Sequence, residues 1–250
     1  MAFDGDPTCL RWVTDAHRGA PAATGTPDIT LTLARSDESM HGPDTPTATA
    51  GHLSFWGWRA EFDGTRCTAR ISNEFAGERG AKRVASLTRI VLGQWLALRG
   101  ALSFHGAAVV QDGRAWLLVG PRCAGKTTAA TRWAWERVLA DDHVIVMPGP
   151  EGFLAYGTPY TGREGTAWSP EPAPLAAICI LEQAASGSFA PQSRSEAFPA
   201  LVRQVISIGE GRRSSQRVLE ALDTLTKQVP VVRLAFALDS DLPAIVERAA

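Results

Sequence analysis

One segment of the sequence constrains both the fold and the chemistry of this chain. Residues 120–127 read Gly-Pro-Arg-Cys-Ala-Gly-Lys-Thr, a complete GxxxxGK[ST] phosphate-binding loop. The apolar run 115–119 before it has the composition of a strand, and residues 127–137 after it contain no Gly or Pro and can form a helix. Because strand, loop and helix in this order are what the motif requires, the sequence predicts an α/β fold with the loop between a strand and a helix.

The residue types in this loop explain how it binds phosphate. Gly120 and Gly125 let the backbone curl, so that successive N–H groups face an anion. Lys126 reaches the β and γ phosphates of a nucleotide, and the Thr127 hydroxyl is placed to ligate Mg²⁺, which takes oxygen ligands. A turn that happens to precede a lysine is the alternative interpretation, and the flanking strand and helix disfavour it. The residues expected to contact the nucleotide are Gly120, Pro121, Arg122, Cys123, Ala124, Gly125, Lys126, Thr127 and Thr128.

The composition is that of an ordinary globular protein. Of 250 residues, 45% are hydrophobic and 20% are charged, and the formal net charge is -1. This balance gives no reason to expect nucleic acid or a membrane as a partner. No apolar run approaches the roughly 18 residues of a membrane span, and the four cysteines form no CxxC pair. We therefore expect a cytoplasmic protein without a disulfide framework or a zinc site.

The first part of the chain favours strands. Residues 28–34 alternate apolar and polar side chains, as a half-buried strand does. Residues 52–62 and 66–71 flank an Asp63-Gly64 turn and have the pattern of a hairpin. We expect a small β-rich N-terminal subdomain over residues 1–79.

The second part, residues 80–250, is expected to form the main domain. An amphipathic helix is predicted between Gly80 and Gly100, followed by strands over 102–110 and 115–119. Strands outnumber helices and do not alternate with them one for one, so we expect the loop to lie on a mixed sheet. The remaining elements are predicted as strands over 144–147, 152–156, 175–181 and 231–236, and as helices over 196–206, 214–228 and 241–249.

A pair of acidic residues follows the loop at a short distance. Asp141 and Asp142 begin fourteen residues beyond Thr127. A loop helix of about three turns would return the chain to the sheet beside the phosphates. One carboxylate can then ligate Mg²⁺ while the other accepts a proton from an attacking hydroxyl. An Asp-Asp pair in a turn is otherwise usually solvated, and the nearby loop favours the functional interpretation.

His105 is the third candidate residue. It lies in an otherwise apolar strand that ends in residues 107–110. We expect this strand to form a hairpin with the strand that leads into the loop, which places His105 near the phosphate end of the sheet. A single histidine in such a strand is more often structural than catalytic, so both roles stay open.

These segments together resemble a known family. The runs 104–110, 120–127 and 139–144, in this order, look like the catalytic domain of HPr kinase/phosphorylase and its relatives. They are also similar to the nucleotide core of ATP-dependent phosphoenolpyruvate carboxykinase. The resemblance covers residues 87–147 well and extends loosely to the C-terminus. It implies a P-loop kinase core of this type on a mixed sheet, as a catalytic domain over residues 80–250.

The resemblance also implies roles for single residues. Lys126 and the loop backbone would bind the phosphates of ATP, and Thr127 and Asp141 would hold Mg²⁺. Asp142 would be the general base toward the acceptor hydroxyl. His105 would contact phosphate near the acceptor.

Another segment resembles kinases that modify peptides. Residues 157–163 look like a stretch of HPr-kinase-like proteins encoded near peptide-modifying enzymes, including those implicated in phosphorylating lasso peptides. Arg163 would there clamp a phosphate or a substrate carboxylate. A surface arginine in a Gly-rich loop is an equal alternative.

The chain also departs from the family. HPr kinases carry a Glu-Val-Arg-Gly-Leu-Gly segment after the acidic pair, and this sequence does not contain it, so neither HPr as substrate nor phosphorolysis is expected. Arg122 and Cys123 stand where the family usually has Ser and Gly. A side chain at Cys123 crowds the backbone if this position requires a positive φ.

The sequence thus predicts a Mg-ATP-dependent kinase that phosphorylates a Ser or Thr hydroxyl of a peptide or small protein. A nucleotide-binding module without phosphotransfer and a kinase of small-molecule alcohols are the alternatives. The choice between ATP and GTP, the acceptor and a homo-oligomeric state stay open.

Overall fold

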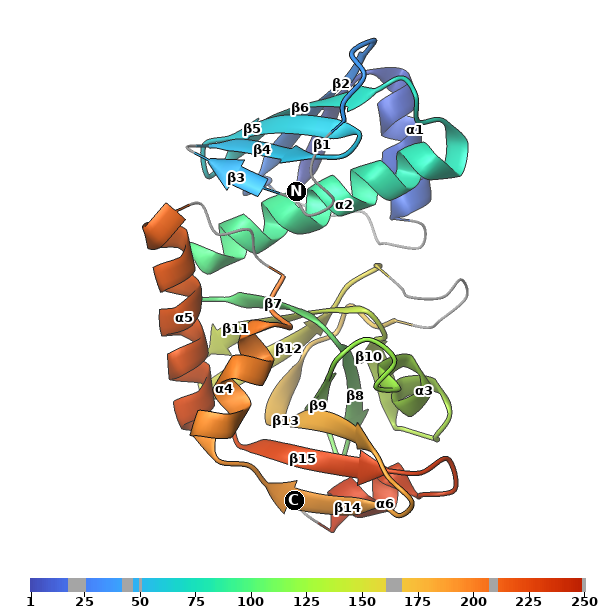
Figure 1. Cartoon of the computed structure of the whole chain (residues 1–250), viewed down its shortest axis with the longest axis vertical. Helices are drawn as coiled ribbons and strands as arrows, with labels where there is room; N and C mark the ends of the chain where they lie inside the picture. Colours follow the sequence, from blue (N-terminus) through green and yellow to red (C-terminus); the bar gives the residue numbers. More distant parts are fainter. Residues whose placement is uncertain (18–25, 42–46, 50, 161–167, 207–210, 249–250) are drawn as a thin grey trace. The chain divides into compact units, whose positions relative to one another are not determined.

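The structure is a computed structural model that describes residues 1–17, 26–41, 47–49, 51–160, 168–206 and 211–248. The chain divides into two compact units (Figure 1). The N-terminal unit contains Met1–Arg99 and Ser207–Val218, and the C-terminal unit contains Gly100–Ile206 and Leu219–Ala250. Both contain helices and sheets, so the expected α/β class is confirmed at this level.

The N-terminal unit is built on a six-stranded sheet. Its strand order is β1-β2-β6-β5-β4-β3. The strands are β1 (Ala2–Gly5), β2 (Thr30–Ser36), β3 (Thr47–Thr49), β4 (His52–Phe55), β5 (Trp58–Phe62) and β6 (Arg66–Ser72), and the helices are α1 (Pro7–Ala16) and α2 (Gly77–Ala97). The predicted hairpin around Asp63-Gly64 is confirmed as the antiparallel pair β5–β6. The strand predicted over 52–62 is in fact two strands, because the chain turns at Gly57 with φ 92°.

The helix predicted between Gly80 and Gly100 is present as α2 and belongs to the N-terminal unit. Its buried Val84, Leu87 and Val91 join one hydrophobic cluster with Leu31 and Leu33 of β2. The domain boundary expected at residue 80 lies inside this helix, whereas the compact unit extends to Arg99. The apolar face of α2 packs on the N-terminal sheet, and sequence periodicity shows that a helix has such a face without showing which sheet covers it.

The C-terminal unit is built on a nine-stranded mixed sheet (Figure 1). Strands β9, β13 and β15 run parallel to one another, and the other pairings of this sheet are antiparallel. The strands are β7 (Leu102–His105), β8 (Ala107–Gln111), β9 (Arg114–Val119), β10 (Arg137–Ala140), β11 (His143–Gly149), β12 (Gly152–Gly157), β13 (Ala173–Gln183), β14 (Ser188–Pro191) and β15 (Val231–Phe236). The helices are α3 (Lys126–Thr131), α4 (Arg194–Val202), α6 (Leu242–Glu247) and, from Leu219 onward, α5 (Gly211–Gln228), whose first residues belong to the N-terminal unit. The predicted mixed sheet is therefore confirmed.

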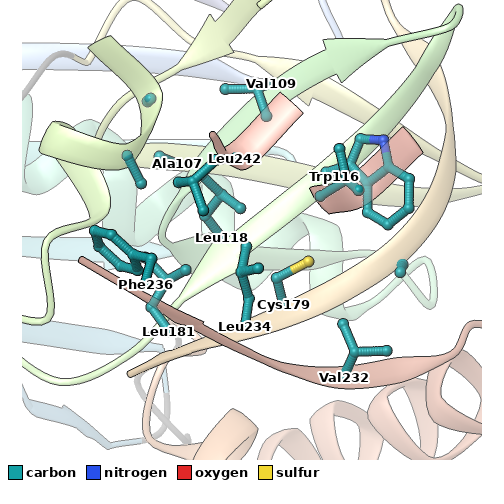
Figure 2. Packing of buried hydrophobic residues seen from close by; sticks show 14 of the residues in the cluster. Ala107, Val109, Trp116, Leu118, Cys179, Leu181, Val232, Leu234, Phe236 and Leu242 are labelled. Atoms are coloured by element: carbon teal, nitrogen blue, oxygen red, sulfur yellow. The ribbon is translucent and has the colours of Figure 1, made fainter. Parts of the chain in front are cut away.

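Alternate residues of the central strands form one hydrophobic cluster of this unit. Figure 2 shows Leu118 of β9, Cys179 and Leu181 of β13, and Leu234 and Phe236 of β15 within this cluster. Residues two apart on a strand face the same side of a sheet, so these side chains share one face. The cluster also takes in alanines of α3 and Leu242 of α6. The short loop helix is thus anchored directly on the sheet.

The loop helix is shorter than predicted. A helix over 127–137 was expected, but α3 ends at Thr131. The indole Nε1 of Trp135 donates a hydrogen bond to the Ala129 carbonyl at 2.8 Å, which turns the chain back over the helix end. The following residues then pair with β8 as strand β10, where Leu139 and Ala140 are fully buried. The tertiary packing of these residues overrides their helical propensity.

The strand predicted over 102–110 is broken at Gly106. Strand β7 before the break pairs with β11, whereas β8 after it pairs with β9 and β10. The hairpin with the strand leading into the loop is therefore formed by β8, not by the strand of His105. A Cβ at Gly106 would lie 2.9 Å from the Leu118 carbonyl oxygen. Glycine is needed here because the backbone of β9 passes too close for any side chain.

This close approach makes a testable prediction. Gly106→Ala should lower the free energy of unfolding by about 1–3 kcal/mol, because the added methyl forces the β7–β8 junction away from β9. Urea denaturation measures this change. His105→Ala, at the exposed neighbouring position, should cost less than about 1 kcal/mol. Wild-type stability of Gly106→Ala would contradict the steric account.

Candidate functional site

The glycine-containing loop connects β9 to α3 in a tightly curved path. Gly125 precedes the helix with φ 94°, and a Cβ there would lie 2.9 Å from Cζ of Phe236. Both the backbone angle and the Phe236 ring therefore require glycine at this position. Cys123 also has a positive φ, 66°. A residue with a Cβ thus adopts the left-handed conformation here, which is the conformation that favours glycine.

Lys126 is held by the carbonyl groups at the start of the loop. It is 8% exposed, and its Nζ donates hydrogen bonds to Gly120 O at 2.9 Å and to Pro121 O at 3.1 Å. An ammonium group has three N–H donors, so within the ranges that the structure describes one is left for a ligand. Burial lowers the pKa of Lys126 below its usual value, while the charge of Asp142 acts in the opposite direction. An anion bound beside this ammonium would offset the unfavourable desolvation.

The acidic pair lies at a junction between strands. Asp141 and Asp142 connect β10 to β11, and His105 and Gly106 form the junction between β7 and β8. The Gly106 N–H donates a hydrogen bond to the Asp142 carbonyl at 3.1 Å, and His105 pairs in register with His143. The two junctions therefore lie side by side. As a result, His105 Nδ1 is 3.3 Å from Asp142 Oδ1.

The two aspartates differ in their exposure to solvent. Asp141 is 1% exposed, and the side chain of Asp142 is 19% exposed. A buried carboxylate is unfavourable unless a cation or hydrogen-bond donors stabilise it, which suits Asp141 to a metal-binding role. Asp142 keeps access to solvent, which suits it to exchange protons with a substrate.

The next residue, His143, anchors the start of β11. It is fully buried, and its Nε2 hydrogen bonds with the Ser103 hydroxyl. The Thr158 hydroxyl lies 3.2 Å from His143 Nδ1 and donates to the His143 carbonyl at 2.7 Å. This polar network fixes the backbone directly after Asp142 and so limits the movement of the acidic pair.

One cavity collects most of the predicted site residues. Its volume is about 320 Å³, and it lies entirely in the C-terminal unit. Its lining residues are His105, Arg122, Cys123, Gly125, Lys126, Thr127, Thr128, Asp141, Asp142 and Gln183. The loop, the acidic pair and His105, which are separate in the sequence, are therefore neighbours in the fold.

Four predicted site residues do not line this cavity. Gly120 and Pro121 act through their carbonyl groups on Lys126. Ala124 is buried in the core beneath the loop. Arg163 lies outside the described residues.

Gln183 lines the cavity as well, although no motif in the sequence indicated it. It is the last residue of β13, and its Nε2 donates a hydrogen bond to the Cys123 carbonyl at 2.9 Å. Strand β13 was predicted, but its position beside β9 is a long-range pairing that no local pattern shows. The signal available in the sequence was the polar pair Glu182 and Gln183, which follows the apolar run 175–181.

The donors present fit a magnesium ion. Thr127 and Asp141 contribute a hydroxyl and a carboxylate to the cavity wall, and Mg²⁺ prefers such hard oxygen ligands. In the described part of the chain, no group of three or more His, Cys, Asp or Glu side chains gathers as a metal site. Few protein ligands are needed where substrate phosphates and water complete the coordination.

A comparison with protein families identifies the relatives of this chain. A family model described as SynChlorMet cassette protein ScmC matches residues 82–249, more than half of the chain. The chain belongs to the ScmC family. The match includes every residue of the cavity described above. No curated protein matches the chain.

Membership of the ScmC family does not by itself assign a reaction, because the family description names none. Among the helices in the described ranges, none is long and apolar enough to span a bilayer.

The positive φ of Cys123 leads to a prediction. Cys123→Gly should raise the free energy of unfolding by roughly 1 kcal/mol, because glycine adopts the left-handed region without the steric cost that a Cβ brings. Chemical denaturation measures the difference. Cys123→Ala keeps the Cβ and should match the wild type. Destabilisation by Cys123→Gly would show that the thiol itself holds the loop.

Proposed function

We propose that this ScmC-family protein is a Mg-ATP-dependent kinase that transfers the γ-phosphoryl group to a hydroxyl, a Ser or Thr of a peptide or small protein. The supporting observation is the single cavity that holds the loop lysine and threonine together with two aspartates and a histidine. Such a kinase would have a P-loop core of the HPr kinase and phosphoenolpyruvate carboxykinase type. The protein would be located in the cytoplasm, where ATP is present.

The binding step uses the loop. The remaining N–H of Lys126 and the loop backbone would contact the β and γ phosphates of ATP. Thr127 and Asp141 would hold Mg²⁺, which when bound neutralises charge on the phosphate oxygens. Phosphoryl transfer depends mainly on positioning and charge neutralisation, and these residues supply both.

The transfer step uses Asp142. Its carboxylate would accept the proton of the acceptor hydroxyl while the new O–P bond forms and the bond from the γ phosphorus to the β-phosphate oxygen breaks, leaving ADP. His105, with Nδ1 3.3 Å from Asp142 Oδ1, would orient this carboxylate by donating a hydrogen bond. The histidine is half exposed and so also lies within reach of an incoming acceptor.

The open side of the cavity favours a large acceptor. His105, Arg122, Cys123 and Gln183 on its wall are all exposed to solvent. A kinase of small alcohols would need a closed pocket around the hydroxyl. An open rim instead leaves room for a peptide chain to bring a Ser or Thr to Asp142.

A nucleotide-binding module without phosphotransfer is the second candidate. Cys123, where related kinases usually have glycine, is the observation that favours it. Both candidates bind nucleotide, so only transfer to an acceptor distinguishes them.

If the loop binds nucleotide, removing the Lys126 charge should reduce the affinity for Mg-ATP. Lys126→Met should lower the affinity for Mg-ATP by at least about 100-fold, because the charged donor to the phosphates is removed. Isothermal titration calorimetry measures the affinity. Lys227→Met serves as the control and should bind Mg-ATP like the wild type. Lys227 is an exposed lysine of the same unit that pairs with Asp223. Equal binding by Lys126→Met would exclude the loop as the nucleotide site.

If Asp142 is the general base, its replacement should slow phosphoryl transfer without weakening Mg-ATP binding. Asp142→Asn should bind Mg-ATP with nearly wild-type affinity but phosphorylate acceptors about 100- to 10,000-fold more slowly, because the amide accepts no proton. Transfer of labelled phosphate to a Ser/Thr peptide library, with and without Mg²⁺, measures the rate. A wild type that binds Mg-ATP and labels no peptide, or an Asp142→Asn variant as active as the wild type, would contradict the proposal.

A further inference from the structure

Gln183 connects the phosphate loop to the neighbouring strand. Strand β13 runs parallel to β9, with Ile180 opposite Val119, so both strands end next to the loop. Gln183 is the final residue of β13 and lines the same cavity as Lys126. Its side-chain Nε2 donates to the Cys123 carbonyl at 2.9 Å.

This hydrogen bond fixes one peptide plane of the loop from one side. The carbonyl of Cys123 and the N–H of Ala124 belong to the same planar peptide group and point in opposite directions. The carbonyl is held by Gln183, and the N–H donates to the Pro121 carbonyl at 3.1 Å. The peptide plane after Cys123 is therefore held at both ends.

The conformation fixed in this way is an unfavourable one. Cys123 has φ 66°, a region that costs a residue with a Cβ about 1–2 kcal/mol. In the described part of the chain, the other hydrogen bonds of residues 121–124 stay within the loop and Lys126. The Gln183 amide is thus the external contact that opposes relaxation of Cys123 toward negative φ.

We propose that Gln183 is a positioning residue, which holds the Cys123–Ala124 peptide group of the loop in the conformation that receives the triphosphate. This inference rests on the proposed function, since it assigns a role within the same nucleotide site. Gln183 acts through the loop backbone and not on the acceptor. Its removal therefore weakens nucleotide binding without changing acceptor recognition.

Gln183→Ala should raise the dissociation constant of Mg-ATP by roughly five- to tenfold, the equivalent of one hydrogen bond. Gln183→Glu should weaken binding further, because a carboxylate donates no hydrogen bond to Cys123 and repels the phosphates. The KM for the peptide acceptor should stay unchanged in both variants. Gln111→Ala is the matched control, since Gln111 lies at the end of β8 and its amide bonds to Glu247 instead of the loop.

The reactivity of the Cys123 thiol measures nucleotide binding at the loop. Cys123 is exposed, whereas Cys9, Cys67 and Cys179 are buried. Burial raises the pKa of Cys9 to about 11 and that of Cys67 to about 12, so these thiols stay protonated near pH 8. Reaction with a chromogenic disulfide reagent therefore reports Cys123. Mg-ATP should protect Cys123 in the wild type, and Gln183→Ala should need several-fold more Mg-ATP for the same protection.

The outcomes separate this inference from the proposed function. Weaker Mg-ATP binding and weaker protection in Gln183→Ala, at an unchanged melting temperature and with a wild-type-like Gln111→Ala, support the positioning role. A wild type that binds Mg-ATP together with a Gln183→Ala variant that binds equally well overturns the role and leaves the proposed function standing. A wild type that neither binds Mg-ATP nor shows protection of Cys123 overturns both.

Discussion

The candidate site depends on one backbone hydrogen bond, from the Gly106 N–H to the Asp142 carbonyl at 3.1 Å. It joins the junction between β7 and β8 to the junction between β10 and β11. At both junctions the chain crosses from one antiparallel pair, β7–β11, to the other, β8–β10, or back. Gly106 fits there because a Cβ would meet the Leu118 carbonyl of β9, two residues before the loop. The same contact therefore positions His105, the acidic pair and the phosphate loop together.

The charges around the cavity explain why a divalent cation belongs to the proposal. Lys126 and Arg122 contribute two positive charges, and Asp141 and Asp142 contribute two negative ones. The wall is thus nearly neutral, whereas a nucleoside triphosphate carries several negative charges. A divalent ion held by Asp141 would offset that excess, because such an ion carries the largest local charge in a site of this kind. The burial of Lys126 strengthens its attraction for phosphate by reducing screening.

Features encoded by local sequence were predictable, and features set by long-range pairing were not. The loop, the acidic pair and the strands around them follow from motif, spacing and periodicity. The early end of α3 depends on Trp135 folding back onto Ala129, a contact that helical propensity does not include. The break at Gly106 and the approach of Gln183 to Cys123 both follow from which strands lie beside β9. Arg163 lies outside the described residues, so its role stays a prediction.

The most direct test of the central claim is a crystal structure with Mn²⁺ and a non-hydrolysable ATP analogue, in which anomalous scattering locates the metal. The account predicts a triphosphate along residues 120–127, within hydrogen-bonding distance of Lys126 Nζ. It predicts Mn²⁺ about 2 Å from the Thr127 hydroxyl and the Asp141 carboxylate. A nucleotide bound elsewhere, or a metal that contacts neither residue, would contradict the account.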